Sequence, residues 1–118
     1  MESAAISQKV SLQLPPPTGE DGRSDQQRLL DALRPQWGQV EMGVGLLRQL
    51  YPLCREAQGH VTATLVWKGT GRPLTAIEPG DTTACHYGLA VDLGSTSVSM
   101  ELIDLNTGEV CCRQSRYN

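Results

Sequence analysis

The chain has 118 residues, with 10 lysines and arginines against 13 aspartates and glutamates, a formal net charge of −3 and an isoelectric point near 5.3. This balance excludes nucleic-acid binding through a basic surface, because that binding depends on lysine and arginine side chains that displace counterions from phosphates. No run approaches the roughly 20 apolar residues needed to cross a bilayer, and residues 1–10 lack the apolar centre of a secretory signal. We therefore expect a cytoplasmic protein that binds neither nucleic acid nor membrane.

Residues 1–23 are polar and rich in proline. The triplet Pro15, Pro16 and Pro17 favours an extended, stiff backbone without internal hydrogen bonds. We predict that residues 1–23 form a flexible, proline-rich linker.

A helix is predicted to begin after Ser24. Ser24 and Gln27 have the spacing of a capping box, and Asp25 lies where the positive end of the helix dipole favours a carboxylate. The apolar stripe of this helix consists of Leu29, Leu30 and Leu33. Pro35 disfavours the helical conformation in the residue before it, so the helix is predicted to end near Arg34.

Residues 40–57 have apolar side chains at helical spacing, but Gly43, Gly45 and Pro52 weaken the pattern. We predict about two helical turns, a break at Pro52, and one further turn that ends before Gly59. Residues 60–68 then alternate with period two, which predicts a strand with one apolar face. That face contains Val61, Ala63, Leu65 and Trp67.

Residues 69–73 are predicted to turn the chain, so that residues 74–77 pair back as a short strand before the turn at Pro79 and Gly80. Trp37 and Trp67 could stack on a planar cofactor, but with no phenylalanine in the chain we favour a role as core anchors. Lys68 and Arg72 flank the hairpin tip. They could contact a partner, although a solvated loop is the favoured interpretation.

The four cysteines offer neither a C-x₂-C pair nor the C-x₄-C-x₂-C spacing of a plant-type ferredoxin. Cys111 and Cys112 are adjacent in a predicted strand and point to opposite faces, which makes a shared site or a simple disulfide unfavourable. We predict that these residues, with Cys54 and Cys85, are buried thiols in a reducing compartment. Cys85 with His86, and His60, are weak candidates for metal ligands because no further Cys or His lies nearby in sequence.

The most informative segment is an apolar run followed by Asp92, Gly94, Ser95, Thr96 and Ser97. The run at residues 89–91 is predicted to form a buried strand that ends at the Asp92 carboxylate. The glycine permits a tight turn, and successive amides and hydroxyls after it can face phosphate oxygens. A carboxylate beside such a turn can hold a hydrated Mg²⁺. This pattern predicts a phosphate-binding hairpin, with the role of Asp92 toward the metal mediated by water.

An ordinary hairpin turn remains open as an alternative, because Asp, Gly and Ser are common turn residues. A second turn signal, at residues 106–109, follows an apolar run. Residues 88–117 are therefore predicted to form a three-stranded antiparallel meander.

A strand that ends in D-x-G-x-T before a long hairpin resembles the first phosphate motif of the ASKHA superfamily, which includes acetate and sugar kinases, heat-shock chaperones and actin. Residues 87–110, YGLAVDLGSTSVSMELIDLNTGEV, with the preceding turn at residues 77–81 and the following SRYN, are similar to the reductive activators of corrinoid proteins. The resemblance implies an α/β (α+β) fold. It comprises a linker helix, a small helical and β-hairpin unit, and a meander that begins a truncated ribonuclease H-like ATPase domain.

The resemblance also implies a division of the chain into a linker (1–23), a linker and middle region (24–84) and the beginning of the ATPase domain (85–118). Members of this family use ATP to drive an electron from a [2Fe–2S] centre to a Co(II) corrinoid. The expected partners are the corrinoid protein of a methyltransferase system and the electron-donating ferredoxin domain, and a homodimer is possible.

In this interpretation Asp92 positions Mg²⁺ through water, Gly94 permits close approach of the phosphates of ATP, and the three hydroxyl residues bind them. The family more often has threonine where this chain has Ser95 and Ser97. The other nucleotide motifs lie outside the 118 residues. We therefore expect the chain alone to contain no catalytic residues, to hold neither ATP nor Mg²⁺ nor the iron–sulfur centre, and to be inactive.

Two other interpretations remain open at this point. The chain could belong to another ATPase or sugar kinase of the same superfamily, although such kinases usually begin with the phosphate hairpin. It could instead be a non-enzymatic module that docks a ferredoxin or a corrinoid protein.

Overall fold

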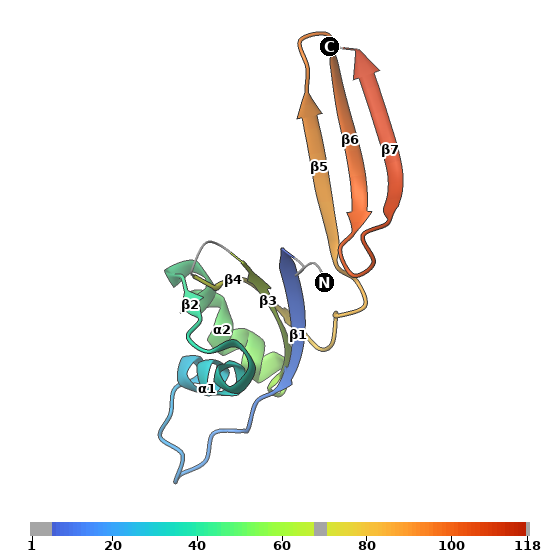
Figure 1. Ribbon diagram of the computed structural model, residues 1–118. Coiled ribbons are helices and arrows are strands. Elements are labelled where there is room, and N and C mark those ends of the chain that lie inside the picture. The colour runs from blue at the N-terminus through green and yellow to red at the C-terminus, as the bar shows by residue number, and fades with distance from the viewer. Residues whose placement is uncertain (1–5, 68–70, 118) are drawn as a thin grey trace. The chain divides into compact units, whose positions relative to one another are not determined.

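The computed structural model describes residues 6–67 and 71–117, and these form two compact units that divide between Thr83 and Ala84 (Figure 1). The first unit contains β1 (Ser7–Gln13), α1 (Asp25–Trp37), β2 (Glu41–Met42), α2 (Val44–Glu56), β3 (His60–Val66) and β4 (Pro73–Pro79). The second contains β5 (Tyr87–Leu93), β6 (Ser97–Asp104) and β7 (Val110–Tyr117). The mixture of helices and sheets agrees with the predicted α+β class.

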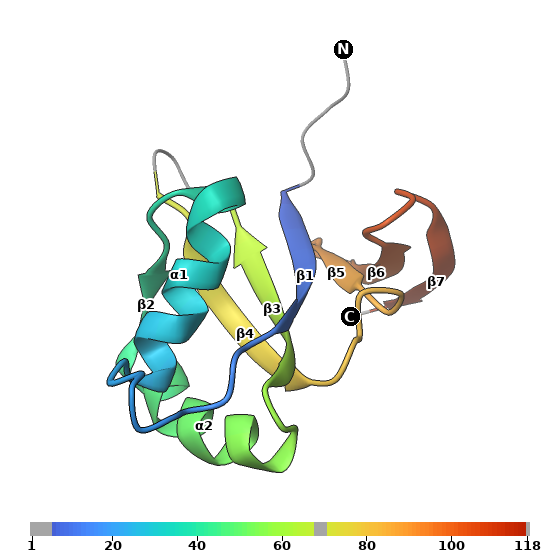
Figure 2. The ribbon, with the colours of Figure 1, turned by 90° about the horizontal axis from the view of Figure 1, so that it is seen from below.

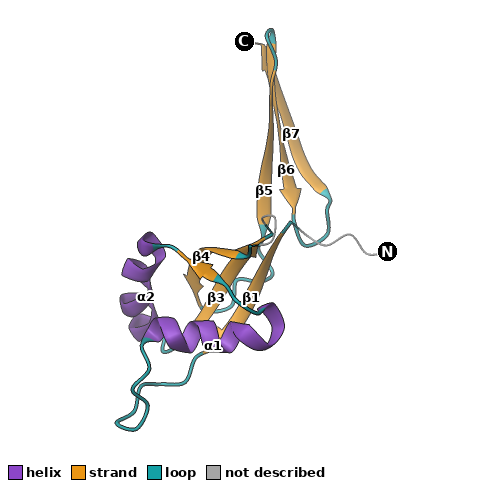
Figure 3. Ribbon diagram, turned by 60° about the vertical axis from the view of Figure 1, so that its left-hand side comes forward, coloured by secondary structure: helices purple, strands orange, loops and turns teal. Residues whose placement is uncertain are grey.

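The first unit is a four-stranded sheet in the order β1-β3-β4-β2, with both helices packed on one side of it (Figures 2 and 3). Strand β3 pairs antiparallel with β1 and β4, whereas the short β2 pairs parallel with β4. Because side chains alternate along a strand, every second residue of β3 faces the helices. The core between the layers is formed by Leu29, Leu33, Trp37, Leu50, Cys54, Val61, Ala63, Leu65, Leu74 and Ile77 with Leu14.

The prediction that residues 1–23 form a flexible linker is wrong for residues 7–13, which form β1. In this strand Val10 pairs with Ala63 and Leu12 pairs with Val61, so two apolar side chains join the core face. Leu14, just after the strand, is 3% exposed. Burial of these alternate residues explains why a segment that is polar on average is nevertheless part of the sheet.

Helix α1 begins as predicted, because the Ser24 hydroxyl accepts a hydrogen bond of 3.2 Å from the Gln27 amide. The predicted end near Arg34 is wrong, since the helix continues through Pro35 to Trp37. Pro35 forfeits one hydrogen bond, but the continuation places Trp37 in the core one turn after Leu33.

Helix α2 is also continuous across its proline, which contradicts the predicted break at Pro52. Leu50 and Cys54 lie on either side of Pro52 and are both buried, so core packing holds the two halves of the helix in line. The chain leaves the helix through Gln58 and Gly59, which have φ values of 54° and 79°. The expected helix end before Gly59 is thus confirmed.

Strands β3 and β4 confirm the predicted pair, and Val61, Ala63 and Leu65 face the core as expected. The opposite face of β3 is buried as well, because Thr62 and Thr64 are only 0% and 7% exposed. The predicted hairpin tip and Lys68 fall largely outside the described residues.

The two tryptophans differ in burial. Trp37 is 5% exposed and is the expected core anchor. The same expectation is wrong for Trp67, which is 39% exposed, with its ring centroid 6.1 Å from that of Trp37. The guanidinium of Arg72 lies 4.3 Å from the ring centroid of Trp67. Arg72 is therefore not part of a freely solvated loop, which corrects the favoured interpretation of this residue.

Charged side chains attach the proline-rich segment to α1. Arg28 is 3% exposed and donates to the carboxylates of Asp21 (3.3 Å) and Asp25 (3.1 Å). Arg23 binds Asp21 at 3.0 Å and Asp31 at 3.1 Å. Hydrogen bonds from Arg23, with a further one from Arg28, hold the pKa of the Asp21 carboxyl well below its usual value of 3.8.

The second unit confirms the predicted meander, with strand order β5-β6-β7 and antiparallel pairing throughout. The β6–β7 turn contains Gly108 at φ 82°, and the Asp104 amide donates to the Glu109 carbonyl at 2.9 Å. The residues described in this unit include no helix.

The expectation that residues 89–91 form a buried strand is wrong, because Leu89 and Val91 are 62% and 50% exposed. One face of the β5–β6 pair carries exposed apolar side chains, because a single layer of three strands has no second layer against which to bury that face. They are Tyr87, Leu89, Val91, Leu93 and Met100.

Buried thiols were expected at all four cysteines, yet only Cys54 is buried, and Cys85, Cys111 and Cys112 are exposed.

We predict that Gly59→Ala destabilises the first unit. Gly59 has φ 79°, and an added Cβ would lie 2.6 Å from the carbonyl oxygen of Leu14, so strain and displacement together should cost about 1–3 kcal/mol. Gly45→Ala, in α2 with open space around it, is the matched control and should stabilise by up to about 1 kcal/mol. Urea unfolding of both variants measures the difference, and equal midpoints would contradict the strained geometry at Gly59.

We predict that acid weakens the first unit through Asp21. Its folded pKa lies below the unfolded value of 3.8, so the unfolded chain binds the proton more readily. The stabilisation is complete above the unfolded pKa and is lost as the pH falls below it. Urea midpoints at pH 6 and pH 3 should therefore differ less in Asp21→Asn than in the unchanged chain. Glu20→Gln, a neighbouring exposed carboxylate, should leave the difference unchanged, and an equal loss in all three proteins would refute the role of Asp21.

Candidate functional site

The five residues predicted to bind phosphate lie together at the β5–β6 turn. Leu93 pairs with Val98, and the Gly94 amide donates to the Ser97 carbonyl at 2.8 Å, which closes the hairpin with Ser95 and Thr96 at its tip. Both tip residues are exposed. The turn therefore presents two hydroxyls to solvent, with the Asp92 carboxylate two residues before Gly94.

Gly94 suits the close approach of the two sides of the hairpin. It does not adopt a positive φ, but a Cβ at this position would lie 3.0 Å from the Ser97 carbonyl oxygen, closer than side chains tolerate without displacement. The absence of a side chain thus permits close approach within the turn. This contact lies within the turn, so Gly94 is compatible with both the ordinary turn and the phosphate-binding hairpin.

Asp92 faces the polar side of the meander. It pairs with Ser99, and together with Ala90, Val91 and Glu101 these residues line an open hollow of about 280 Å³. Glu101 accepts from Arg113 at 2.9 Å, and the hydroxyls of Ser99 and Ser115 are 3.2 Å apart.

Sequence reasoning missed Ser99 and Glu101. Ser97, Ser99 and Glu101 alternate along β6, and this spacing could have placed all three beside Asp92 had the pairing of Leu93 with Val98 been known. The alternation of these polar residues was visible in the sequence, but their position beside Asp92 depends on the register between β5 and β6.

The donor set suits Mg²⁺ only in a water-mediated arrangement. Carboxylate and hydroxyl oxygens are the ligands that Mg²⁺ prefers, and it commonly keeps several waters when it is bound to phosphates. Among residues 6–67 and 71–117, no group of three or more His, Cys, Asp or Glu side chains could hold a metal ion directly. Asp92 therefore fits contact with a hydrated, phosphate-bound ion better than a site built by the protein alone.

The other candidate ligands lie apart from this hairpin along the chain. His86 is 6% exposed, and its carbonyl accepts from the Leu105 amide at 2.8 Å. The Nε2 atom of His60 lies 3.3 Å from the Ser11 hydroxyl in the first unit. Neither helix is long and apolar enough to span a membrane, as judged over the residues that the structure describes.

Three comparisons with known proteins bear on this chain. The model of the RACo linker region matches residues 2–84, and that of the RACo middle region matches residues 87–118. The middle-region match thus falls on the segment that was expected to begin the ATPase domain. Comparison with curated proteins gave no match.

A solved structure, a reductive activator for corrinoid, iron–sulfur protein, is 29% identical in sequence to this chain and superposes with a TM-score of 0.80. The likeness covers 100% of this chain but only 19% of the solved one. Because the linker model alone covers more than half of the sequence, the chain belongs to the RACo family and carries sequence from its linker and middle regions.

Proposed function

We propose that this chain is part of an ATP-dependent reductive activator that returns a corrinoid from Co(II) to Co(I), with the electron supplied by a [2Fe–2S] centre elsewhere in the activator. The partner is the corrinoid protein of a methyltransferase system. The observation that carries the proposal is the Asp92–Ser97 hairpin in the segment that matches the RACo middle region. The likeness to a reductive activator supports the assignment of the corrinoid.

Four residues of the hairpin have distinct roles in binding ATP. Ser95 and Thr96 have no side-chain hydrogen bond to another described residue, so both hydroxyls can turn to phosphate oxygens without breaking a bond. Asp92 would hold the water shell of a phosphate-bound Mg²⁺, which would supply positive charge against the phosphates. Gly94 lets the turn close tightly, so that the two hydroxyl residues stand at its tip. These residues act by positioning and by hydrogen bonding.

The apolar face of the meander supports a site that is completed by further chain. Tyr87, Leu89, Val91, Leu93 and Met100 are exposed together, and a patch of this kind normally packs against another element. One open hairpin leaves the adenine and most of the phosphates in water. Tight ATP binding therefore requires the longer protein.

The test has two arms. The purified 118-residue chain should hydrolyse ATP no faster than background. In the longer activator, Asp92→Asn should lower corrinoid-dependent ATP turnover about 100-fold, the order lost when one preorganised electrostatic contact is removed. Glu20→Gln, an exposed carboxylate in the first unit, is the control and should retain full turnover.

Turnover by the short chain that disappears in Asp92→Ala would show that the site is already complete. Full turnover by the longer protein with Asp92→Asn would remove the hairpin from the mechanism.

A further inference from the structure

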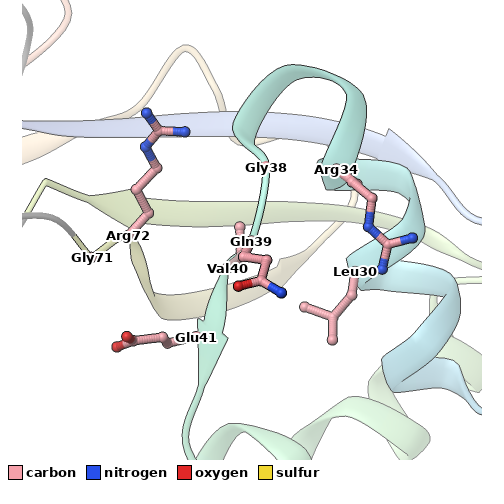
Figure 4. A pocket seen from close by; sticks show the side chains of 8 residues that line it. All are labelled: Leu30, Arg34, Gly38, Gln39, Val40, Glu41, Gly71 and Arg72. Carbon is pink, nitrogen blue, oxygen red and sulfur yellow. The ribbon is translucent and has the colours of Figure 1, made fainter.

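The first unit contains a cavity of about 290 Å³ where the end of α1 meets the start of β4 (Figure 4). Leu30 and Arg34 reach it from α1, Arg72 lies on the opposite side, and Gln39 lies between them in this view (Figure 4). Gly38, Val40, Glu41 and Gly71 complete the lining. The cavity belongs to the first unit and the phosphate hairpin to the second, so binding in the cavity is independent of the proposed function.

Arg72 is held in place by its surroundings. Its Nη1 donates to the Trp37 carbonyl at 2.5 Å, and its guanidinium lies 4.3 Å from the centroid of the Trp67 ring. The hydrogen bond to the Trp37 carbonyl and the contact with the Trp67 ring together fix the planar guanidinium. This group has five N–H donors, and the carbonyl uses one of them. The cation is therefore preorganised and retains donors for another acceptor.

Arg72 differs from the other arginines that are fixed in this unit. Four of them contact at least one aspartate: Arg23, Arg28, Arg34 and Arg55. Arg72 contacts no carboxylate among the residues that the structure describes. A guanidinium that is partly buried and lacks an acid partner favours a carboxylate or phosphate from outside the chain.

The rest of the lining distinguishes between these two anions. Leu30 and Val40 provide an apolar wall that the methylene groups of a side chain can cover, and Gln39 offers an amide to a peptide group. Inorganic phosphate would contact neither the apolar wall nor the Gln39 amide. A glutamate residue in a peptide can contact both of these and the guanidinium of Arg72.

We propose that this cavity binds a glutamate side chain from an acidic segment of a partner protein, with Arg72 as its principal contact. Arg34 adds positive charge from the opposite side, although Asp31 already accepts from it at 3.1 Å. Glu41 is exposed on the rim, has no ion pair within the described chain, and opposes the approach of a carboxylate. Removal of the charge at Glu41 should therefore strengthen binding of the glutamate side chain, whereas a change at Arg72 should weaken it.

The test uses the 118-residue chain and two capped tripeptides, acetyl-Ala-Glu-Ala-amide and its Gln counterpart. Indole N–H signals of Trp37 and Trp67 report on the cavity in an NMR titration. The Glu peptide should shift them saturably at millimolar concentration, and the Gln peptide should bind at least about tenfold more weakly, because it lacks the charge-assisted bond.

Three variants test the contacts. Arg72→Lys should weaken binding of the Glu peptide several-fold, since lysine keeps the charge but loses the fork and the stacking. Glu41→Gln should strengthen it about two- to threefold, and this exposed position does not endanger the fold. Arg48→Gln, an exposed arginine on α2 that does not line the cavity, is the matched control and should change nothing.

The proposal is overturned if the Glu peptide produces no saturable shift, if the Gln peptide binds equally well, or if Glu41→Gln leaves the affinity unchanged. Inorganic phosphate is a separate arm. Phosphate that binds at least as tightly as the Glu peptide, with the same dependence on Arg72, would show a general anion site and overturn the assignment to a peptide.

Discussion

Burial of β3 on both of its faces is the constraint that organises the first unit. Val61, Ala63 and Leu65 pack against the helices, so their side of the strand must be covered by α1 and α2. On the other side the Thr62 hydroxyl donates to the Gly80 carbonyl at 2.6 Å and accepts from the Thr82 amide at 3.0 Å. A buried hydroxyl without such partners would be costly. Strand β3 therefore holds the two helices on one face and the segment around Gly80 and Thr82 on the other.

The strands were predictable where period two was visible in the sequence. Residues 60–66 and the meander alternate or run apolar over enough positions to exclude a helix. Strand β1 was missed although Val10, Leu12 and Leu14 alternate with polar residues, because the alternation is short and runs into the proline triplet that favoured a linker. Local rules also failed at Pro35 and Pro52, where burial of Trp37 and Cys54 outweighs the loss of one helical hydrogen bond at each proline.

The candidate site shows the same division between local and long-range information. The residues from Asp92 to Ser97 lie at one hairpin, from the end of β5 to the start of β6, which local sequence can specify. Ser99 and Glu101 join them only through the register of β5 with β6. The setting of Arg72 was beyond sequence reasoning altogether, because its contacts to Trp37 and Trp67 connect residues distant along the chain.

Stability is distributed unevenly between the two units. The first unit surrounds a continuous core, whereas the meander exposes its large apolar side chains. Amide hydrogen exchange of the 118-residue chain measures this difference directly, because protection reports the free energy of opening each segment. We predict that β3 amides exchange only on global unfolding of the first unit, and that β6 amides exchange much faster, although both are central strands. Equal protection of β3 and β6 would contradict an uneven distribution of stability.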